Sequence, residues 1–181
     1  MTPAEYYQLK AFARIDGALV ALLWTCSFIC YIIGFTSTAY GMAAIVLLVA
    51  TPFYVARRLR RFRDVARAGI ISFARSWAYT VLVFFYGAVL LAVVHYVYFA
   101  YLDRGYVIQT LSNALASPQG KMMVEQYGIG QTVSESMEML REMRPIDYAL
   151  NILTLNIMAG VVLGLPIAAF VQRKNTVTPN T

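Results

Sequence analysis

Few side chains in this sequence are of the types that carry proton transfer inside an apolar segment. His95 is the single histidine, and it lies one or two helical turns from the end of a long apolar segment. A proton relay there would need further ionisable partners in the segment, and the sequence provides none. We favour an interfacial side chain bonded to Tyr98, Tyr101 or Asn151. The alternative is that His95 and Asn151 mark a functional cavity.

The two cysteines, Cys26 and Cys30, lie four residues apart in the first apolar segment. No histidine or acid accompanies them at a metal-binding spacing, so we interpret them as small packing residues and expect no metal site. The sequence also contains no GxSxG, HExxH or Walker motif and no pair of carboxylates within an apolar segment. We therefore predict that the protein is not an enzyme and uses no cofactor.

One acid, Asp16, stands directly before the first apolar segment. Arg14 and Arg75 can reach the same interface, so an ion pair on the cytoplasmic side is the expected role. An acid at the mouth of a cavity is the alternative interpretation.

Seven arginines surround Asp64 between residues 57 and 75. Arg57, Arg60 and Arg61 share one helical face, which predicts a basic amphipathic helix on the cytoplasmic surface, interrupted at Gly69. Each arginine near an anionic surface contributes roughly 1 kcal/mol, so the segment could hold anionic lipid headgroups or a membrane-associated enzyme. An equally simple interpretation is that these charges only set topology. The candidate binding residues are Arg57, Arg58, Arg60, Arg61 and Arg63.

The composition predicts an all-α polytopic membrane protein. Hydrophobic residues make up 60% of the 181 residues, charged residues only 13%, and the mean hydropathy is +0.60. The formal charge of +6 is confined to short segments beside apolar runs, so insertion topology explains it better than a nucleic-acid partner. We expect a single membrane domain with four transmembrane helices in an up-down-up-down bundle. The predicted spans are about 17–35, 42–56, 76–102 and 148–171.

The connections between the spans predict the orientation. Eleven of the 15 lysines and arginines fall on the side of the termini and of the basic loop 57–75, including Arg173 and Lys174. The positive-inside rule then places both termini in the cytoplasm and the loop 103–147 outside. Within that outer loop we expect two short helices, one over Val107 to Leu115 and one opened by a capping box from Thr132 to Glu135.

Small residues recur every four positions in the fourth span, at Asn156, Gly160 and Gly164. Such a stripe lets another helix approach closely. We favour packing against a helix of the same chain, and a homodimer face is the alternative. That alternative carries a second functional hypothesis, a small dimeric transporter or flippase-like lipid-handling protein, in which His95 and Asn151 line a cavity together with Thr154 and Asn156.

Short motifs in the middle of the chain resemble those of the bacterial domain of unknown function 4199 family. They are the FRD of residues 62–64, Gly69 followed by an Ile-Ser-Phe sequence, the aromatic YVYFAYLD of residues 96–103 and the acidic, methionine-rich segment VSESMEMLREM. The single Gly69 and the pair Asp103-Arg104 depart from the family pattern, which more often has two glycines and Asp-Pro. The resemblance implies a four-helix inner-membrane protein of Gram-negative bacteria without established activity. It also implies a weak association with enzymes of polyprenyl-phosphate glycan synthesis.

Overall fold

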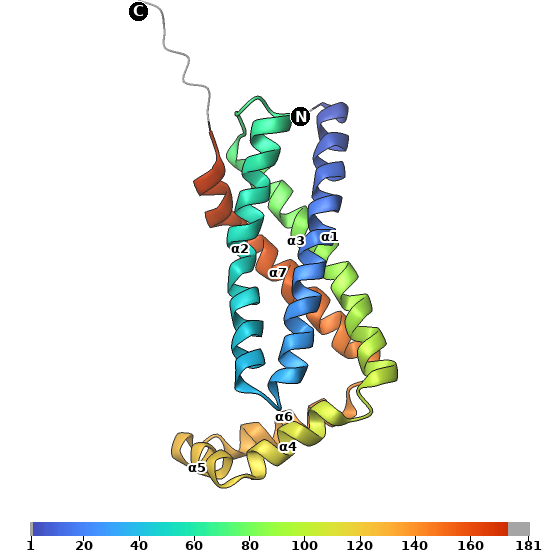
Figure 1. The fold of residues 1–181 in the computed structure, drawn as a ribbon, viewed down its shortest axis with the longest axis vertical. Coiled ribbons are helices and arrows are strands. Elements are labelled where there is room, and N and C mark those ends of the chain that lie inside the picture. Colours follow the sequence, from blue (N-terminus) through green and yellow to red (C-terminus); the bar gives the residue numbers. More distant parts are fainter. Residues whose placement is uncertain (1, 174–181) are drawn as a thin grey trace, which may run out of the picture. The chain divides into compact units, whose positions relative to one another are not determined.

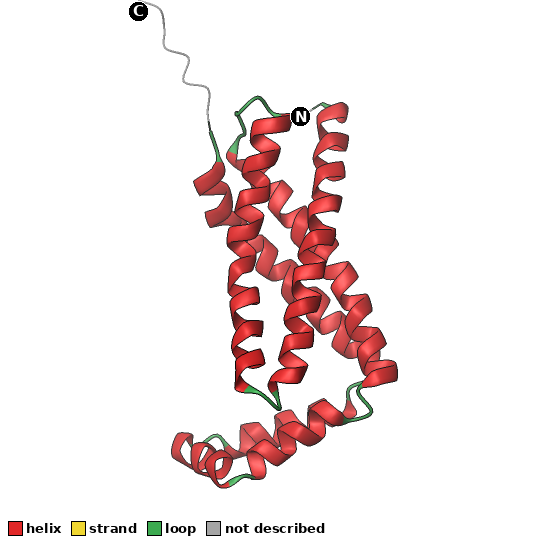
Figure 2. Cartoon of the chain, viewed as in Figure 1, coloured by secondary structure: helices red, strands yellow, loops and turns green. Residues whose placement is uncertain are grey.

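The computed structural model describes residues 2–173, so Lys174 and the polar tail after it lie outside the described residues. No β-strand forms within residues 2–173, which confirms the all-α prediction. The chain divides into two compact units, and the expectation of a single membrane domain stays a prediction. The first contains the residues up to Ala92 and those from Ile152, and the second is Val93–Asn151. Figures 1 and 2 show the helices: α1 (Pro3–Gly34), α2 (Thr38–Ala66), α3 (Phe73–Val97), the π-helix η1 (Tyr98–Leu102), α4 (Tyr106–Ala116), α5 (Pro118–Tyr127), α6 (Gly130–Glu142) and α7 (Pro145–Val171).

Four of these helices are long and apolar enough to cross a membrane: α1, α2, α3 continued by η1, and α7. Successive long helices alternate in direction (Figure 1). In the most apolar 18-residue window of each, only 17% to 44% of the residues are buried inside the protein. The remaining apolar side chains face outward, and in water they would form a far larger patch than soluble proteins tolerate. The chain is therefore a multi-pass membrane protein.

The long helices α1 and α2 extend beyond the apolar segments that predict them. The helix α1 was expected to begin near residue 17 and begins at Pro3, because Thr2 and Glu5 form a capping box and proline occupies the first helical position. The helix α2 was expected to end near residue 56 and runs to Ala66, so the expected basic helix is a direct continuation of α2. Arginine is a good helix former, and the chain leaves α2 only where Ala68 and Gly69 adopt positive φ values of 50° and 81°.

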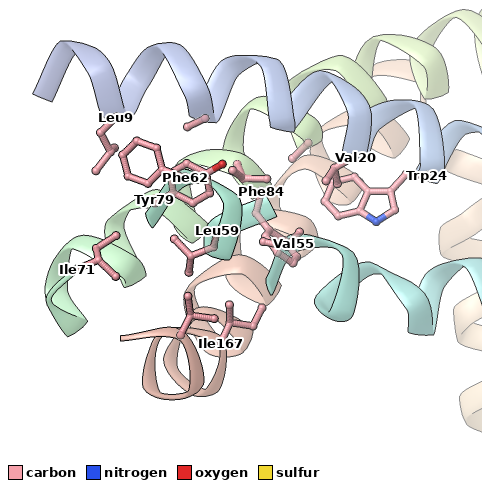
Figure 3. Packing of buried hydrophobic residues seen from close by; sticks show 14 of the residues in the cluster. Leu9, Val20, Trp24, Val55, Leu59, Phe62, Ile71, Tyr79, Phe84 and Ile167 are labelled. Carbon is pink, nitrogen blue, oxygen red and sulfur yellow. The ribbon is translucent and has the colours of Figure 1, made fainter. Parts of the chain in front are cut away.

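The core of the first unit lies among α1, α2, α3 and α7, as Figure 3 shows. Phe62 stacks on Tyr79 with 4.8 Å between ring centroids, and Trp24 meets Phe84 edge to face at 5.5 Å. Ile71, in the connection between α2 and α3, also belongs to this core. Its backbone pairs with that of Arg173 in an isolated β-bridge, which holds this connection against the end of α7.

Glycines permit the closest helix crossings in the first unit. A Cβ added to Gly17 of α1 would lie 2.7 Å from the Cβ of Tyr86 and 2.9 Å from the carbonyl oxygen of Val83, both on α3. From the other side, a Cβ added to Gly87 would lie 3.2 Å from the carbonyl oxygen of Gly17. The backbones of α1 and α3 therefore meet where glycine leaves room, as small residues do between helices in lipid.

The second unit contains three short helices where two were expected. The additional helix is α5, which begins at Ser117-Pro118: the Ser117 side chain accepts a hydrogen bond from the backbone N–H of Gly120, and Pro118 takes the first helical position. The helix α6 begins at Gly130, so the expected capping box at Thr132 lies inside the helix. Local capping explains the start of α5, whereas Ile129, the residue before α6, forms no side-chain capping bond.

Candidate functional site

The seven arginines of the basic segment fall into two groups. Four are half-buried and each bonds to an acid, while three are exposed. The half-buried residues are Arg58, Arg63, Arg67 and Arg75. The exposed residues are Arg57, Arg60 and Arg61. The two groups point to different roles, one inside the fold and one at its surface.

Asp16 is the most deeply buried acid among the described residues, with 2% of its surface exposed. Arg58 of α2 donates to one carboxylate oxygen through Nε and Nη2, and the hydroxyl of Tyr79 on α3 donates to the other. This carboxylate thus joins α1, α2 and α3. The expected ion pair exists, but its partner is Arg58, and the arginines named from the sequence, Arg14 and Arg75, are not the partners. Because each carboxylate oxygen has a donor, the charge is compensated within the fold.

A second acid, Glu5, joins the beginning of α1 to the basic segment. Its Oε1 lies 2.8 Å from Nη2 of Arg67, and its Oε2 lies 3.0 Å from Nη2 of Arg75. The backbone N–H of Thr2 also donates to Oε2 at 2.9 Å. Arg67 and Arg75 therefore both bind the N-terminal end of α1 through Glu5.

The fourth half-buried arginine, Arg63, holds the end of α7. Its Nε lies 2.8 Å from Oδ1 of the neighbouring Asp64, and its Nη1 donates to the carbonyl oxygen of Val171 at 3.0 Å. Carbonyl groups in the last turn of a helix lack intrahelical partners, so a guanidinium there satisfies one of them and favours the helix dipole. Arg63 was a candidate binding residue, and in the structure it has an internal role.

The exposed group continues an apolar face of α2. Outward side chains recur along this helix at helical spacing: Met42, Val46, Val49 and Phe53, each more than half exposed. Arg57 and Arg60 follow on the same face, and Arg61 lies beside them. Within residues 2–173 none of these three arginines forms an ion pair. One helix face therefore leads from exposed apolar side chains directly to exposed guanidinium groups.

The small residues of α7 pack against α3 of the same chain. A Cβ added to Gly160 would lie 2.4 Å from the Cβ of Phe84, and one added to Gly164 would lie 3.0 Å from Cδ1 of Trp77. The amide of Asn156 donates to the carbonyl oxygen of Ile152 in its own helix at 2.8 Å. Because α3 occupies this face, the two glycines are not available as a homodimer seam.

The polar residues proposed to line a cavity differ in exposure and in their contacts. His95 is buried, with 8% of its surface exposed, and its ring centroid lies 6.4 Å from that of Phe99. Asn151 and Thr154 are exposed, and Asn156 bonds within its own helix. In the described part of the chain, no three His, Cys, Asp or Glu side chains are grouped so that they could hold a metal ion. The transport hypothesis stays a prediction that these contacts do not test.

Sequence analysis missed Glu5 as a functional neighbour of the basic segment and missed the division among the arginines. The helical period carries a partial signal for the second point, because Arg58 and Arg63 lie away from the face of Arg57, Arg60 and Arg61. Nothing local signals the Glu5 contacts, since they join residues far apart in the sequence.

Comparisons with known proteins identify one family. Residues 16–173 match the family model described as "Protein of unknown function (DUF4199)". No curated protein and no solved structure matches the chain.

Proposed function

The chain belongs to the family described as protein of unknown function (DUF4199), and we propose that it is a non-enzymatic accessory protein of the inner membrane that binds anionic lipid headgroups. The binding residues are Arg57, Arg60 and Arg61. The observation that carries this proposal is the division of the basic segment: four half-buried arginines each bond to an acid, and within residues 2–173 the other three form no ion pair.

The position of the three arginines suits a lipid rather than a soluble anion. On a helix, residues three and four apart are neighbours, so Arg57 is next to both Arg60 and Arg61. Guanidinium groups bind phosphate oxygens through pairs of parallel hydrogen bonds. The apolar face that ends at Phe53 offers an acyl chain a surface to lie along while its phosphate reaches Arg57. A free anion would gain nothing from that apolar face.

The orientation follows from the same charges. Arginines resist translocation, so we propose that the arginine-bearing end of the first unit and both termini are cytoplasmic. Anionic lipids give the cytoplasmic leaflet a negative surface potential, which matches the exposed arginines. An accessory protein of this kind would hold such lipids, or a membrane-associated enzyme that binds them, beside its arginine face.

The test is replacement of Arg57, Arg60 and Arg61 by glutamine together. At roughly 1 kcal/mol for each arginine, affinity for phosphatidylglycerol should fall on the order of 100-fold. Native mass spectrometry of the detergent-purified protein, titrated with phosphatidylglycerol or with phosphatidylcholine, measures bound lipid directly. The four internally paired arginines remain in this variant and should preserve folding and insertion.

A charge-matched control replaces Arg104, Lys121 and Arg141 by glutamine. These three cations are also exposed, and they belong to the second unit. The control loses the same net charge but should retain its phosphatidylglycerol. Equal lipid binding by the α2 variant and the wild-type protein would refute the proposal and leave topology as the role of the arginines. A pulldown with both variants then tests whether any enzyme partner depends on the same arginines.

A further inference from the structure

The helix α5 in the second unit carries an apolar face that nothing in the unit covers. Met122, Met123 and Tyr127 are exposed by 66%, 59% and 67%. At 100° per residue these side chains and two glutamines fall within an arc of about 140° that contains no charged residue. Lys121 lies opposite the centre of this arc, with Glu125 beside it. The helix is therefore amphipathic, and its uncharged side is not covered by the other helices of the second unit.

The other helices of the unit explain why this face stays uncovered. The helices α4 and α6 contact each other, and their apolar residues along that contact are half-buried. The helix α5 contacts both helices, and its closest approach is at the edge that adjoins Tyr127: a Cβ added to Gly120 would lie 2.2 Å from the carbonyl oxygen of Ala114. Val124, on the same edge, is half-buried. Packing within the unit thus uses the Gly120 and Val124 edge and leaves the methionine and tyrosine side free.

The second unit also contains the ends of two membrane-crossing helices. Tyr101 and Leu102 at the end of η1 are exposed by 67% and 65%, and Leu150 in α7 by 52%. Only residues 103–105 separate η1 from α4, and only residues 143 and 144 separate α6 from α7. Both ends of the three-helix excursion are tied this closely to lipid-facing segments, and α4 has only 11 residues, so α5 is within reach of the bilayer surface.

From these observations we propose that α5 lies on the bilayer interface, with Met122, Met123 and Tyr127 inserted among the lipid headgroups and upper acyl chains. Tyrosine is enriched at this depth because its ring is apolar and its hydroxyl is polar. Methionine is flexible enough to fill the irregular space between lipids. Since the arc is uncharged, the contact needs no anionic lipid and forms equally on phosphatidylcholine. This proposal is independent of the arginine site.

Site-directed fluorescence tests the proposal on the full-length protein. Single cysteines replace Met123 or Tyr127 in a background in which Cys26 and Cys30 are alanine, and each is labelled with bimane after reconstitution into phosphatidylcholine vesicles. Lys121→Cys, on the opposite side of the same helix, is the matched control. All three sites are exposed, so the label should not disturb the fold, and circular dichroism checks that it does not.

Two quenchers distinguish a face in the bilayer from a face in water and from a face covered by protein. Doxyl-labelled phosphatidylcholine, with the doxyl group high on the acyl chain, should lower the fluorescence at positions 123 and 127 at least twofold more than at position 121. Aqueous iodide should show the reverse order. If iodide quenches position 123 as strongly as position 121, the face is in water and the proposal is wrong. If neither quencher reaches position 123, a protein surface covers the face, and the bilayer proposal is equally wrong.

Discussion

Asp16 illustrates, at the scale of one residue, how far a local pattern predicts a contact. Its place before an apolar segment predicts an ion pair correctly, because an uncompensated carboxylate there would be costly. Its partner could not be predicted, since Arg58 is 42 positions away and becomes a neighbour only when α1 and α2 pack as antiparallel helices. The contribution of Tyr79 depends on a third helix. Compensation of charge was predictable, and the identity of the groups that provide it was not.

Replacing Asp16 by asparagine should therefore destabilise the protein strongly. Removing one partner of a buried ion pair costs about 3 kcal/mol, because the other charge remains without compensation. Here Arg58 keeps some access to solvent, so we expect a value near the lower end of the measured range. Thermal unfolding in detergent, followed by circular dichroism, measures the change.

The control for this prediction is Asp64→Asn. Asp64 also pairs with an arginine, but its side chain is about half exposed, so its loss should change stability by less than about 1 kcal/mol. Equal melting temperatures for the two variants would mean that the Asp16 contact does not stabilise the bundle.

At the scale of helices, the sequence predicts which segments are helical better than where they end. Apolar runs of about membrane thickness identify all four long helices, because the bilayer demands them. The ends depend on single residues: the Thr2–Glu5 capping box lengthens α1, and Ser117 caps α5, a helix that was not expected. The four-residue spacing of Gly160 and Gly164 correctly indicated a packing face, and only the tertiary structure identifies α3 as its partner.

Replacing Gly160 by leucine should disrupt the contact between α7 and α3. An added Cβ would already overlap Phe84, and overpacking of this kind typically costs about 1 to 3 kcal/mol. Val162→Leu is the matched control, since Val162 lies two residues along α7 and is exposed. Thermal stability in detergent should fall for the first variant and stay unchanged for the second. A stable Gly160→Leu protein whose oligomeric state had changed would instead point to an intermolecular role for this face.

At the scale of the whole molecule, hydropathy and charge predict the topology because they act through the membrane and do not depend on side-chain packing. Four helices that each cross the bilayer once would place residues 2 and 173 on the same side, and the arginine segment predicts that this side is cytoplasmic. The division into two units was not predicted, since both contain parts of the same long helices α3 and α7 and no change of composition marks the boundary. The contacts within the three-helix excursion also depend on tertiary packing.

The proposed orientation leads to a direct prediction for cysteine labelling. In a protein without native cysteines, Ser37→Cys between α1 and α2 and Glu125→Cys in α5 should react in intact cells with a membrane-impermeant maleimide. Asp64→Cys, near the end of α2, should react only after the membrane is opened, because the arginines around it resist translocation. Asp64 is exposed on the protein surface, so lack of labelling in intact cells would reflect the membrane and not burial. If position 64 is labelled in intact cells while positions 37 and 125 are protected, the proposed orientation is wrong. The exposed arginines of α2 would then lie on the side opposite the anionic cytoplasmic leaflet.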